Sequence, residues 1–116
     1  MIAADHKRPM LLDFTGSDWC GWCIKLDTEV FSTEEFRKYA TEKLVLVKID
    51  FPKKKKLSPE QKRQNASLAS KFGVEGFPTL IILSYNGKQL GRMGYRPGGP
   101  GPFLQQLNSL TNGHGK

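Results

Sequence analysis

Apolar residues along this chain fall into short continuous runs that are separated by segments with helical spacing. The runs at Met10–Thr15, Leu44–Ile49 and Thr79–Leu83 predict three buried strands. The second run has five large aliphatic residues in six positions, which predicts an inner strand covered on both faces. Asn86-Gly87 predicts a hairpin turn into a fourth, antiparallel strand at about Lys88–Tyr95. The pattern therefore predicts a mixed sheet of about four strands.

Helical spacing between and after these strands predicts four helices. Cys20 begins the first helix, and a capping box of Ser32 and Glu35 begins the second. A third should run from Ser58, its N-cap, to about Lys71. The last follows a segment rich in proline and glycine, and its apolar face is formed by Phe103, Leu104, Leu107 and Leu110. Strand-helix-strand units followed by a hairpin and a closing helix indicate the α/β class.

The length and composition indicate a single domain. With 116 residues, of which 38% are hydrophobic, the chain can bury one compact core. We assign residues 1–116 to this domain, with flexible ends at 1–9 and 111–116. No apolar stretch approaches the roughly 20 residues that span a bilayer, and Met1–Pro9 lacks the apolar middle of a signal peptide. We therefore expect no membrane span and no signal peptide in this sequence.

The charge is strongly positive and concentrated in one place. Eighteen Lys and Arg against eleven Asp and Glu give a net charge of +7, and Lys53–Lys56 form an unbroken run followed by Lys62 and Arg63. Such runs are typical of solvated surfaces, although they also suit a polyanion such as nucleic acid. The sequence has no recognised nucleic-acid motif, which disfavours nucleic acid as a partner. A binding module that uses this basic surface remains an alternative function.

The segment Trp19-Cys20-Gly21-Trp22-Cys23 holds the only two cysteines, directly after the first predicted strand. A Cys-x-x-Cys pair at a strand-to-helix junction can close a small disulfide ring and expose one sulfur. The amino end of a helix favours negative charge, so Cys20 should be the attacking nucleophile. Cys23 lies one turn further along the helix and should be the resolving thiol. The pair therefore favours a redox dithiol.

Two other uses of the cysteines remain open at this point. Structural zinc needs four ligands, and the only histidines, His6 and His114, both lie in the predicted ends of the chain. We therefore expect no metal site within one chain. A pair of buried, inert cysteines is the second possibility, although the neighbouring Trp19 and Trp22 follow a loop and favour partial exposure.

Beyond these residues, the chain resembles the thioredoxin-like family from Met10 to about Leu110. The resemblance rests on Trp-Cys-Gly-x-Cys after a strand containing Asp13-Phe14, and on Gly76-Phe77-Pro78-Thr79 at the start of another strand. Within the family, the segment 14–23 is most similar to small bacterial extracytoplasmic disulfide reductases, including the carboxy-terminal domain of a membrane electron transporter. The resemblance implies a thioredoxin-like fold that lacks the first strand and helix of full thioredoxin.

The resemblance also implies roles for individual residues. Cys20 would be the nucleophile, Cys23 the resolving cysteine, and Asp13 a buried acid that aids proton transfer. The lysine that accompanies this acid in thioredoxin is replaced by Leu46, so burial without that partner should raise the pKa of Asp13. Pro78 would follow a cis peptide bond beside the dithiol. The substrate groove would be lined by Trp19, Trp22, Phe77, Pro78 and Thr79.

The implied function is thiol-disulfide exchange with other proteins, most simply the reduction or isomerisation of their disulfides. The expected partners are protein disulfides and an upstream thiol reductant, with the chain acting as a monomer outside the cytoplasm. We expect no cofactor besides the Cys20–Cys23 disulfide. Trp22 stands where thioredoxin has proline, at a position that controls redox potential in the family. A dithiol oxidase is therefore an alternative, and the sequence leaves the direction of electron flow open.

Overall fold

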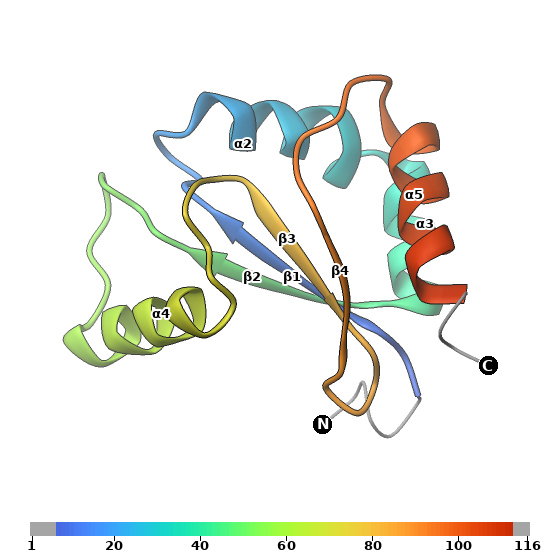
Figure 1. Cartoon of the computed structure of the whole chain (residues 1–116). Helices are drawn as coiled ribbons and strands as arrows, with labels where there is room; N and C mark the ends of the chain where they lie inside the picture. Colours follow the sequence, from blue (N-terminus) through green and yellow to red (C-terminus); the bar gives the residue numbers. More distant parts are fainter. Residues whose placement is uncertain (1–6, 113–116) are drawn as a thin grey trace.

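The structure is a computed structural model, and it describes residues 7–112. One sheet with helices on both faces forms the domain (Figure 1), and it contains the elements β1 (Met10–Thr15), α2 (Gly21–Leu26), η1 (Asp27–Phe31), α3 (Glu34–Lys43), β2 (Val45–Asp50), α4 (Pro59–Lys71), β3 (Thr79–Leu83), β4 (Gln89–Met93) and α5 (Pro100–Asn112). The predicted order of strands and helices is confirmed. The structure contains one element that the sequence pattern does not predict. This is η1, a π-helix that continues α2 directly. Within the described residues, no helix is both long and apolar enough to span a bilayer.

The four strands form one mixed sheet in the order β2-β1-β3-β4. β1 pairs parallel with β2 and antiparallel with β3, and β4 returns antiparallel to β3. The hairpin between β3 and β4 turns at Gly87, whose φ of +91° is a conformation that glycine adopts without strain. The predicted mixed sheet is therefore confirmed, and the strand that carries Asp13 lies in its interior.

The prediction of an inner strand at 44–49 is wrong. β2 lies at the edge of the sheet with β1 as its single neighbour, and the side chain of Leu46 is 41% exposed. The strand that is buried at every position is β1, which has neighbours on both sides. A continuous aliphatic run indicates a strand, but strand order is set by which other segments pair with it.

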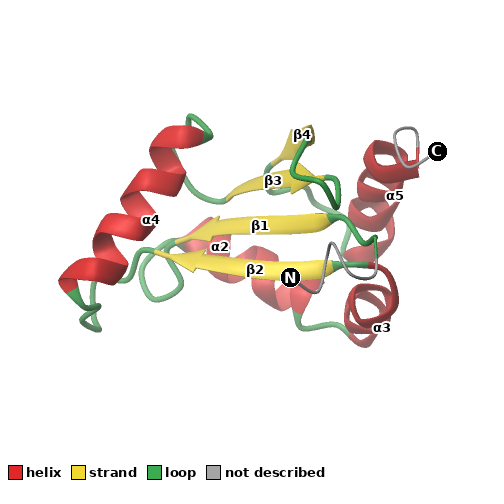
Figure 2. Cartoon of the chain, turned by 90° about the horizontal axis from the view of Figure 1, so that it is seen from below, coloured by secondary structure: helices red, strands yellow, loops and turns green. Residues whose placement is uncertain are grey.

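Each face of the sheet has its own core. The first core lies under α2, η1, α3 and α5, and its fully buried members include Leu11, Phe36, Leu80 and Phe103. The second lies on the face covered by α4, where Phe14 and Ile81 pack with Leu68 and Phe72. Figure 2 shows α4 crossing one end of the sheet, while α3 and α5 lie at the other end. No residue of α4 is fully buried, so this helix is held from one side only.

The second helix begins one residue later than the capping box predicts. Thr33, and not Ser32, is the N-cap of α3, and its Oγ1 accepts a hydrogen bond from the backbone N–H of Phe36 at 3.2 Å. The N–H of Ser32 instead donates to the carbonyl of Asp27 at 2.8 Å and closes the π-turn of η1. The wider π-turn carries the chain one residue further before the next helix can begin.

Parts of the predicted ends 1–9 and 111–116 lie within the described residues, and there they make defined contacts. Arg8 donates to the carbonyl of Thr41, and the carbonyl of Pro9 accepts from the N–H of Val45, each at 3.0 Å. At the other end α5 continues to Asn112, and Thr111 is buried. Residues 1–6 and 113–116, which include His6 and His114, lie outside the described residues.

Candidate active site

Cys20 and Cys23 form a disulfide at the junction between β1 and α2, with their Cα atoms 5.2 Å apart. A tight turn brings Cys20 to this place, because the carbonyl of Gly16 accepts from the N–H groups of Trp19 at 3.2 Å and Cys20 at 2.9 Å. The indole of Trp19 lies directly over Gly16, where a Cβ atom would collide with the ring. A glycine is therefore required at the end of β1 for this turn.

The two sulfur atoms differ in their surroundings. Cys20 is the N-cap of α2, and its Sγ accepts a hydrogen bond from the backbone N–H of Cys23 at 3.3 Å. That bond and the helix amino end both favour negative charge on Cys20. Cys23 lies inside α2 and also lines the cavity beneath the helix. Only 7% of Cys20 and 4% of Cys23 is exposed, so access to sulfur is narrow.

The loop before β3 comes next to the dithiol. The Phe77–Pro78 peptide bond is cis, as the resemblance implies. The carbonyl oxygen of Phe77 lies 3.7 Å from the Sγ of Cys20. Thr79, which follows, turns its hydroxyl back onto the carbonyl of Gly76 at 2.7 Å. Folding thus brings together two motifs that are 57 residues apart in the chain.

Aromatic rings surround the cysteines in two groups. Phe77 packs edge-on against Trp19, with 5.9 Å between ring centroids, and it stacks on Phe51 at 5.0 Å. Trp22, which is 58% exposed, packs against Tyr95 at 5.1 Å. The sequence pattern does not single out Phe51 and Tyr95, because each follows the end of a strand and lacks a local motif. Their contribution depends on contacts that only the folded chain creates.

Asp13 lies beneath α2 and is only 3% exposed. It shares a small cavity with Cys23, and the cavity is also lined by Thr15, Ser17, Ile24, Asp27 and Lys48. Oδ1 of Asp13 has no hydrogen-bond partner among the described residues. Burial raises the pKa of Asp13 to about 7, with smaller upward contributions from Asp27 and Asp50. A carboxyl group with this pKa can take up or release a proton near neutral pH.

Asp13 has a lysine neighbour after all, which corrects the assignment of Leu46 to that position. The parallel register pairs Asp13 with Lys48, whereas Leu46 pairs with Leu11. The positive charge of Lys48 lowers the pKa of Asp13, but by less than burial raises it. The predicted rise in pKa is therefore right in direction, while the reasoning that Asp13 lacks a lysine partner is wrong. Strand register, and not sequence spacing alone, decides which residue faces Asp13.

Zinc binding was one of the other uses of the cysteines that the sequence left open. Among residues 7–112, no three His, Cys, Asp or Glu side chains lie together as a group that could hold a metal ion. The cysteines are paired with each other. This arrangement can exchange a disulfide. The buried carboxyl group of Asp13 shares a cavity with Cys23, and the carbonyl of Phe77 lies beside the sulfur of Cys20.

Comparison with known proteins agrees with this geometry. The family model described as "Thioredoxin-like domain" matches residues 1–109. Disulfide bond reductase DsbH of Chlamydia pneumoniae is 43% identical over 105 residues, which is 90% of this chain and 63% of that protein. The thioredoxin-related protein DsbJ of the same organism is 36% identical over 90 residues, or 78% of this chain and 26% of that protein. The chain thus spans less than two thirds of the length of these two curated relatives.

Solved structures show the same fold. A structure titled "DsbH Oxidoreductase" has a TM-score of 0.88 and 38% identity, and the match covers 95% of this chain and 79% of that one. The reduced carboxy-terminal domain of DsbD from Neisseria meningitidis has a TM-score of 0.68, with 93% of this chain and 86% of that one covered. Its 16% identity supports the fold alone.

Proposed function

The chain belongs to the thioredoxin-like family, and from this premise we propose that it is a thiol-disulfide oxidoreductase that reduces disulfides in other proteins. The observation that carries the proposal is the position of Cys20. Its sulfur caps α2, accepts the N–H of Cys23, and lies 3.7 Å from the carbonyl of Phe77 beside the cis peptide bond. The sulfur that attacks is thus next to backbone that can pair with an extended substrate segment.

The reaction follows from the two sulfur environments. The Cys20 thiolate attacks one sulfur of a substrate disulfide; that S–S bond breaks, and the other substrate sulfur leaves as a thiolate. Cys23 then loses its proton and attacks the Sγ of Cys20, which releases the second substrate thiolate. The Cys20–Cys23 disulfide forms as two electrons pass to the substrate. An upstream thiol reductant must then restore the dithiol.

Asp13 is the group we propose to accept the proton of Cys23. It lines the same cavity as Cys23, and burial places its pKa at about 7, so it is partly ionised at neutral pH. A general base works best when its pKa lies near the operating pH, because a large fraction is then ionised and the ionised group still takes up a proton readily. Replacing it, Asp13→Asn, should slow release of the mixed disulfide by about 100-fold at pH 7. Attack by Cys20 should change far less.

Substrate contact is proposed for the exposed rings and for the loop at the cis bond. Trp19, Phe77 and Pro78 form one side, and Trp22 adds an exposed ring on the other. Thr79 begins β3 directly after the cis bond.

The direction of electron flow, from this protein to its substrate, is proposed from the name of DsbH, a disulfide bond reductase that is 43% identical to this chain. An extracytoplasmic location and a monomeric state remain parts of this proposal, which fractionation and light scattering would test.

Single cysteine replacements test the assignment of roles. Cys20→Ser should abolish reduction of insulin disulfides, because it removes the attacking sulfur. Cys23→Ser should instead accumulate a mixed disulfide with the substrate, detectable by mass spectrometry, because the second step is lost. The assignment would be reversed if Cys23→Ser were inert and Cys20→Ser trapped substrate.

A redox titration against glutathione tests the direction. A reductase should give a potential near that of thioredoxin, about −270 mV, and a strong oxidase one near about −120 mV. A value at the oxidising end would replace the reductase proposal with the oxidase.

A further inference from the structure

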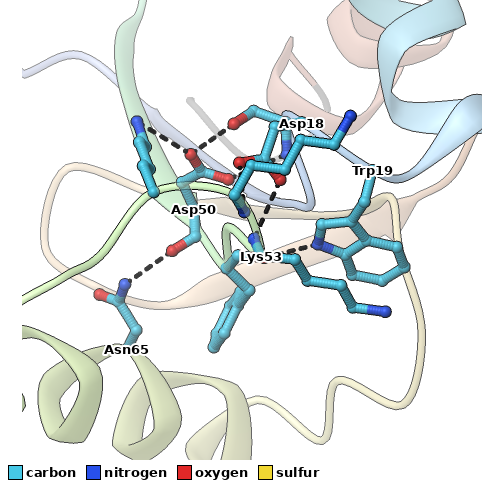
Figure 3. A network of polar contacts seen from close by, with 9 residues as sticks. Asp18, Trp19, Asp50, Lys53 and Asn65 are labelled. Atoms are coloured by element: carbon cyan, nitrogen blue, oxygen red, sulfur yellow. Dashed lines mark hydrogen bonds and ion pairs between the residues drawn. The ribbon is translucent and has the colours of Figure 1, made fainter.

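The lysine run lies against the turn that precedes Cys20. We call Lys53–Lys56, between β2 and α4, the lysine loop. The carboxylate of Asp18 accepts hydrogen bonds from the backbone N–H groups of Lys53 at 2.9 Å and Lys54 at 3.0 Å. The indole N–H of Trp19 donates to the carbonyl of Phe51 at 2.7 Å (Figure 3). The loop is thus attached to the active-site turn by two consecutive residues.

A second group of bonds holds the base of the lysine loop. The carboxylate of Asp50 accepts from the N–H of Ser17 at 2.9 Å and from its hydroxyl at 2.5 Å. Lys55 forms an ion pair with the same carboxylate at 3.5 Å, and Asn65 of α4 donates to the carbonyl of Asp50 at 2.9 Å. Figure 3 shows this network between the end of β2, the turn and α4. The loop therefore has a defined place beside the site.

That place brings positive charge close to the dithiol. The ammonium of Lys53 lies 3.9 Å from the centroid of the Trp19 ring. Trp19 in turn packs edge-on against Phe77, whose carbonyl lies 3.7 Å from the Sγ of Cys20. The Trp19 ring thus contacts both the lysine charge and the ring of Phe77, and both aromatic residues belong to the proposed substrate groove.

Most of this charge is available to a partner. All four residues of the lysine loop are exposed. Within residues 7–112, only Lys55 of the four forms an ion pair. The nearby carboxylates of Asp18 and Asp50 already accept hydrogen bonds from backbone N–H groups. Their pKa values are lowered, so both carboxylates stay ionised at neutral pH. The bonds from Lys53 and Lys54 to Asp18 use backbone N–H groups, so within residues 7–112 they leave both ammonium groups without a carboxylate partner.

We propose that the lysine loop binds acidic residues of the protein whose disulfide is exchanged, so that disulfides flanked by Asp or Glu are preferred substrates. The inference rests on the proposed function and names the partner chemistry of that site. An extended segment whose cysteine reaches Cys20 would pass Trp19 and Phe77, and its neighbouring carboxylates would meet Lys53 and Lys54. Charge complementarity of this kind raises association rates and is screened by salt.

The test compares two disulfide-bonded peptides that differ only in having Glu or Gln beside the cysteines. The second-order rate constant for oxidation of the reduced protein is measured with each peptide by stopped-flow tryptophan fluorescence. At low ionic strength the Glu peptide should react about tenfold faster, and the ratio should approach one at about 0.5 M salt. Equal rates at low salt would overturn the inference. Failure to react with either peptide would instead overturn the proposed function.

Matched variants separate the position of the charge from its amount. The double variant Lys53→Gln/Lys54→Gln should bring the Glu-to-Gln ratio close to one. The control Arg37→Gln/Lys38→Gln removes the same charge from exposed positions on α3, away from the loop (Figure 1), and should leave the ratio unchanged. A similar fall in both double variants would show that net charge alone sets the preference, which contradicts the inference.

Asp18→Ala gives the sharpest test, because the two explanations predict opposite signs. It raises the net charge by one but removes the carboxylate that accepts hydrogen bonds from Lys53 and Lys54. Our inference expects a lower ratio, whereas a general charge effect expects a higher one. Asp18→Asn, which keeps one acceptor oxygen, should give an intermediate ratio and serves if the alanine variant does not fold. If a labelled single-stranded oligonucleotide bound through Lys53 and Lys54 while the peptides reacted equally, the loop would be a polyanion site instead.

Discussion

Asp13 and Asp18 lie on either side of the end of β1, and their carboxyl groups have opposite environments. Asp13 is 3% exposed beneath α2, and burial raises its pKa to about 7. Asp18 lies at the surface turn, where the backbone N–H groups of Lys53 and Lys54 hold its pKa below the ordinary value. One short connection thus carries a carboxyl group that can exchange a proton at neutral pH and another that stays ionised.

The difference shows what a nearby lysine can and cannot do. Lys48 is the cross-strand neighbour of Asp13, yet its charge does not offset the loss of water around that carboxyl group. Asp18 receives two directed bonds from backbone N–H groups, which favour the charged form at short range. Desolvation therefore controls the pKa of Asp13, and hydrogen bonding controls the pKa of Asp18.

Asp13→Asn should remove the dependence of stability on pH that the raised pKa of Asp13 causes, which is the largest change expected here. The pKa of Asp13 rises from 3.8 to about 7 on folding, so the folded protein binds more protons between these values. The free energy of unfolding of the oxidised wild type should fall as the pH rises from about 4 to about 7, by up to about 4 kcal/mol at about 1.36 kcal/mol per pKa unit. Asn does not titrate, so the variant should lack this fall. Urea unfolding across this range measures it.

Asp18→Asn is the matched control for that experiment. It changes the same functional group outside the cavity, and it should leave the fall between pH 4 and pH 7 in place. If Asp13→Asn kept the wild-type dependence on pH, the titrating group would not be Asp13.

Lys48→Met should shift the same transition without removing it. The charge of Lys48 lowers the pKa of Asp13, so its loss should move the midpoint of the stability change to higher pH. The shift should stay below about one pH unit, because Lys48 is exposed and water screens its charge. The pH dependence of urea unfolding, repeated with Leu46→Met as control, checks this expectation. An equal shift in the control would contradict the register-based pairing.

Trp19→Phe should lower the free energy of unfolding by a smaller amount, because it weakens the attachment of the turn before Cys20 to the end of β2. The replacement keeps a ring near Phe77 but loses the hydrogen bond from the indole N–H to the carbonyl of Phe51. The expected loss in free energy of unfolding is about 1 kcal/mol, the usual contribution of one such bond. Trp22→Phe is the control, since Trp22 contributes ring contacts with Tyr95 and Lys25. Equal losses in the two variants would mean that the Trp19 bond adds nothing.

Asp18→Ala should change the dependence of stability on pH in the opposite direction to Asp13→Asn. A lowered pKa in the folded state means that ionised Asp18 stabilises the protein above about pH 4. This contribution is lost as the pH falls through the folded pKa, so the variant should lose less stability on acidification than the wild type. Acid unfolding monitored by circular dichroism tests the sign. A steeper acid transition in the variant would contradict the role assigned to Asp18.

Much of the site was predictable because it depends on local signals. The Cys-x-x-Cys spacing, its position after an apolar strand, and the Gly-Phe-Pro-Thr segment all lie within short windows of sequence. The residues that were missed or misplaced act through contacts between distant segments. Lys48 faces Asp13 through strand register, and Asp18 holds a loop that begins 35 residues later. The misplaced cap at Ser32 has a local cause, since hydrophobic spacing does not distinguish a π-turn from an α-turn.

The sequence by itself determined the class of fold, the order of strands and helices, and the pair of sulfur atoms, because apolar periodicity and turn residues specify these locally. Only the tertiary structure decided which strand lies at the edge, which lysine meets the buried acid, and where the lysine loop lies. These features depend on pairing between segments that are far apart in the chain, and on the water that each pairing removes. For that reason the lysine run appears as ordinary solvated surface in the sequence and as a neighbour of Asp18 and Trp19 in the folded protein.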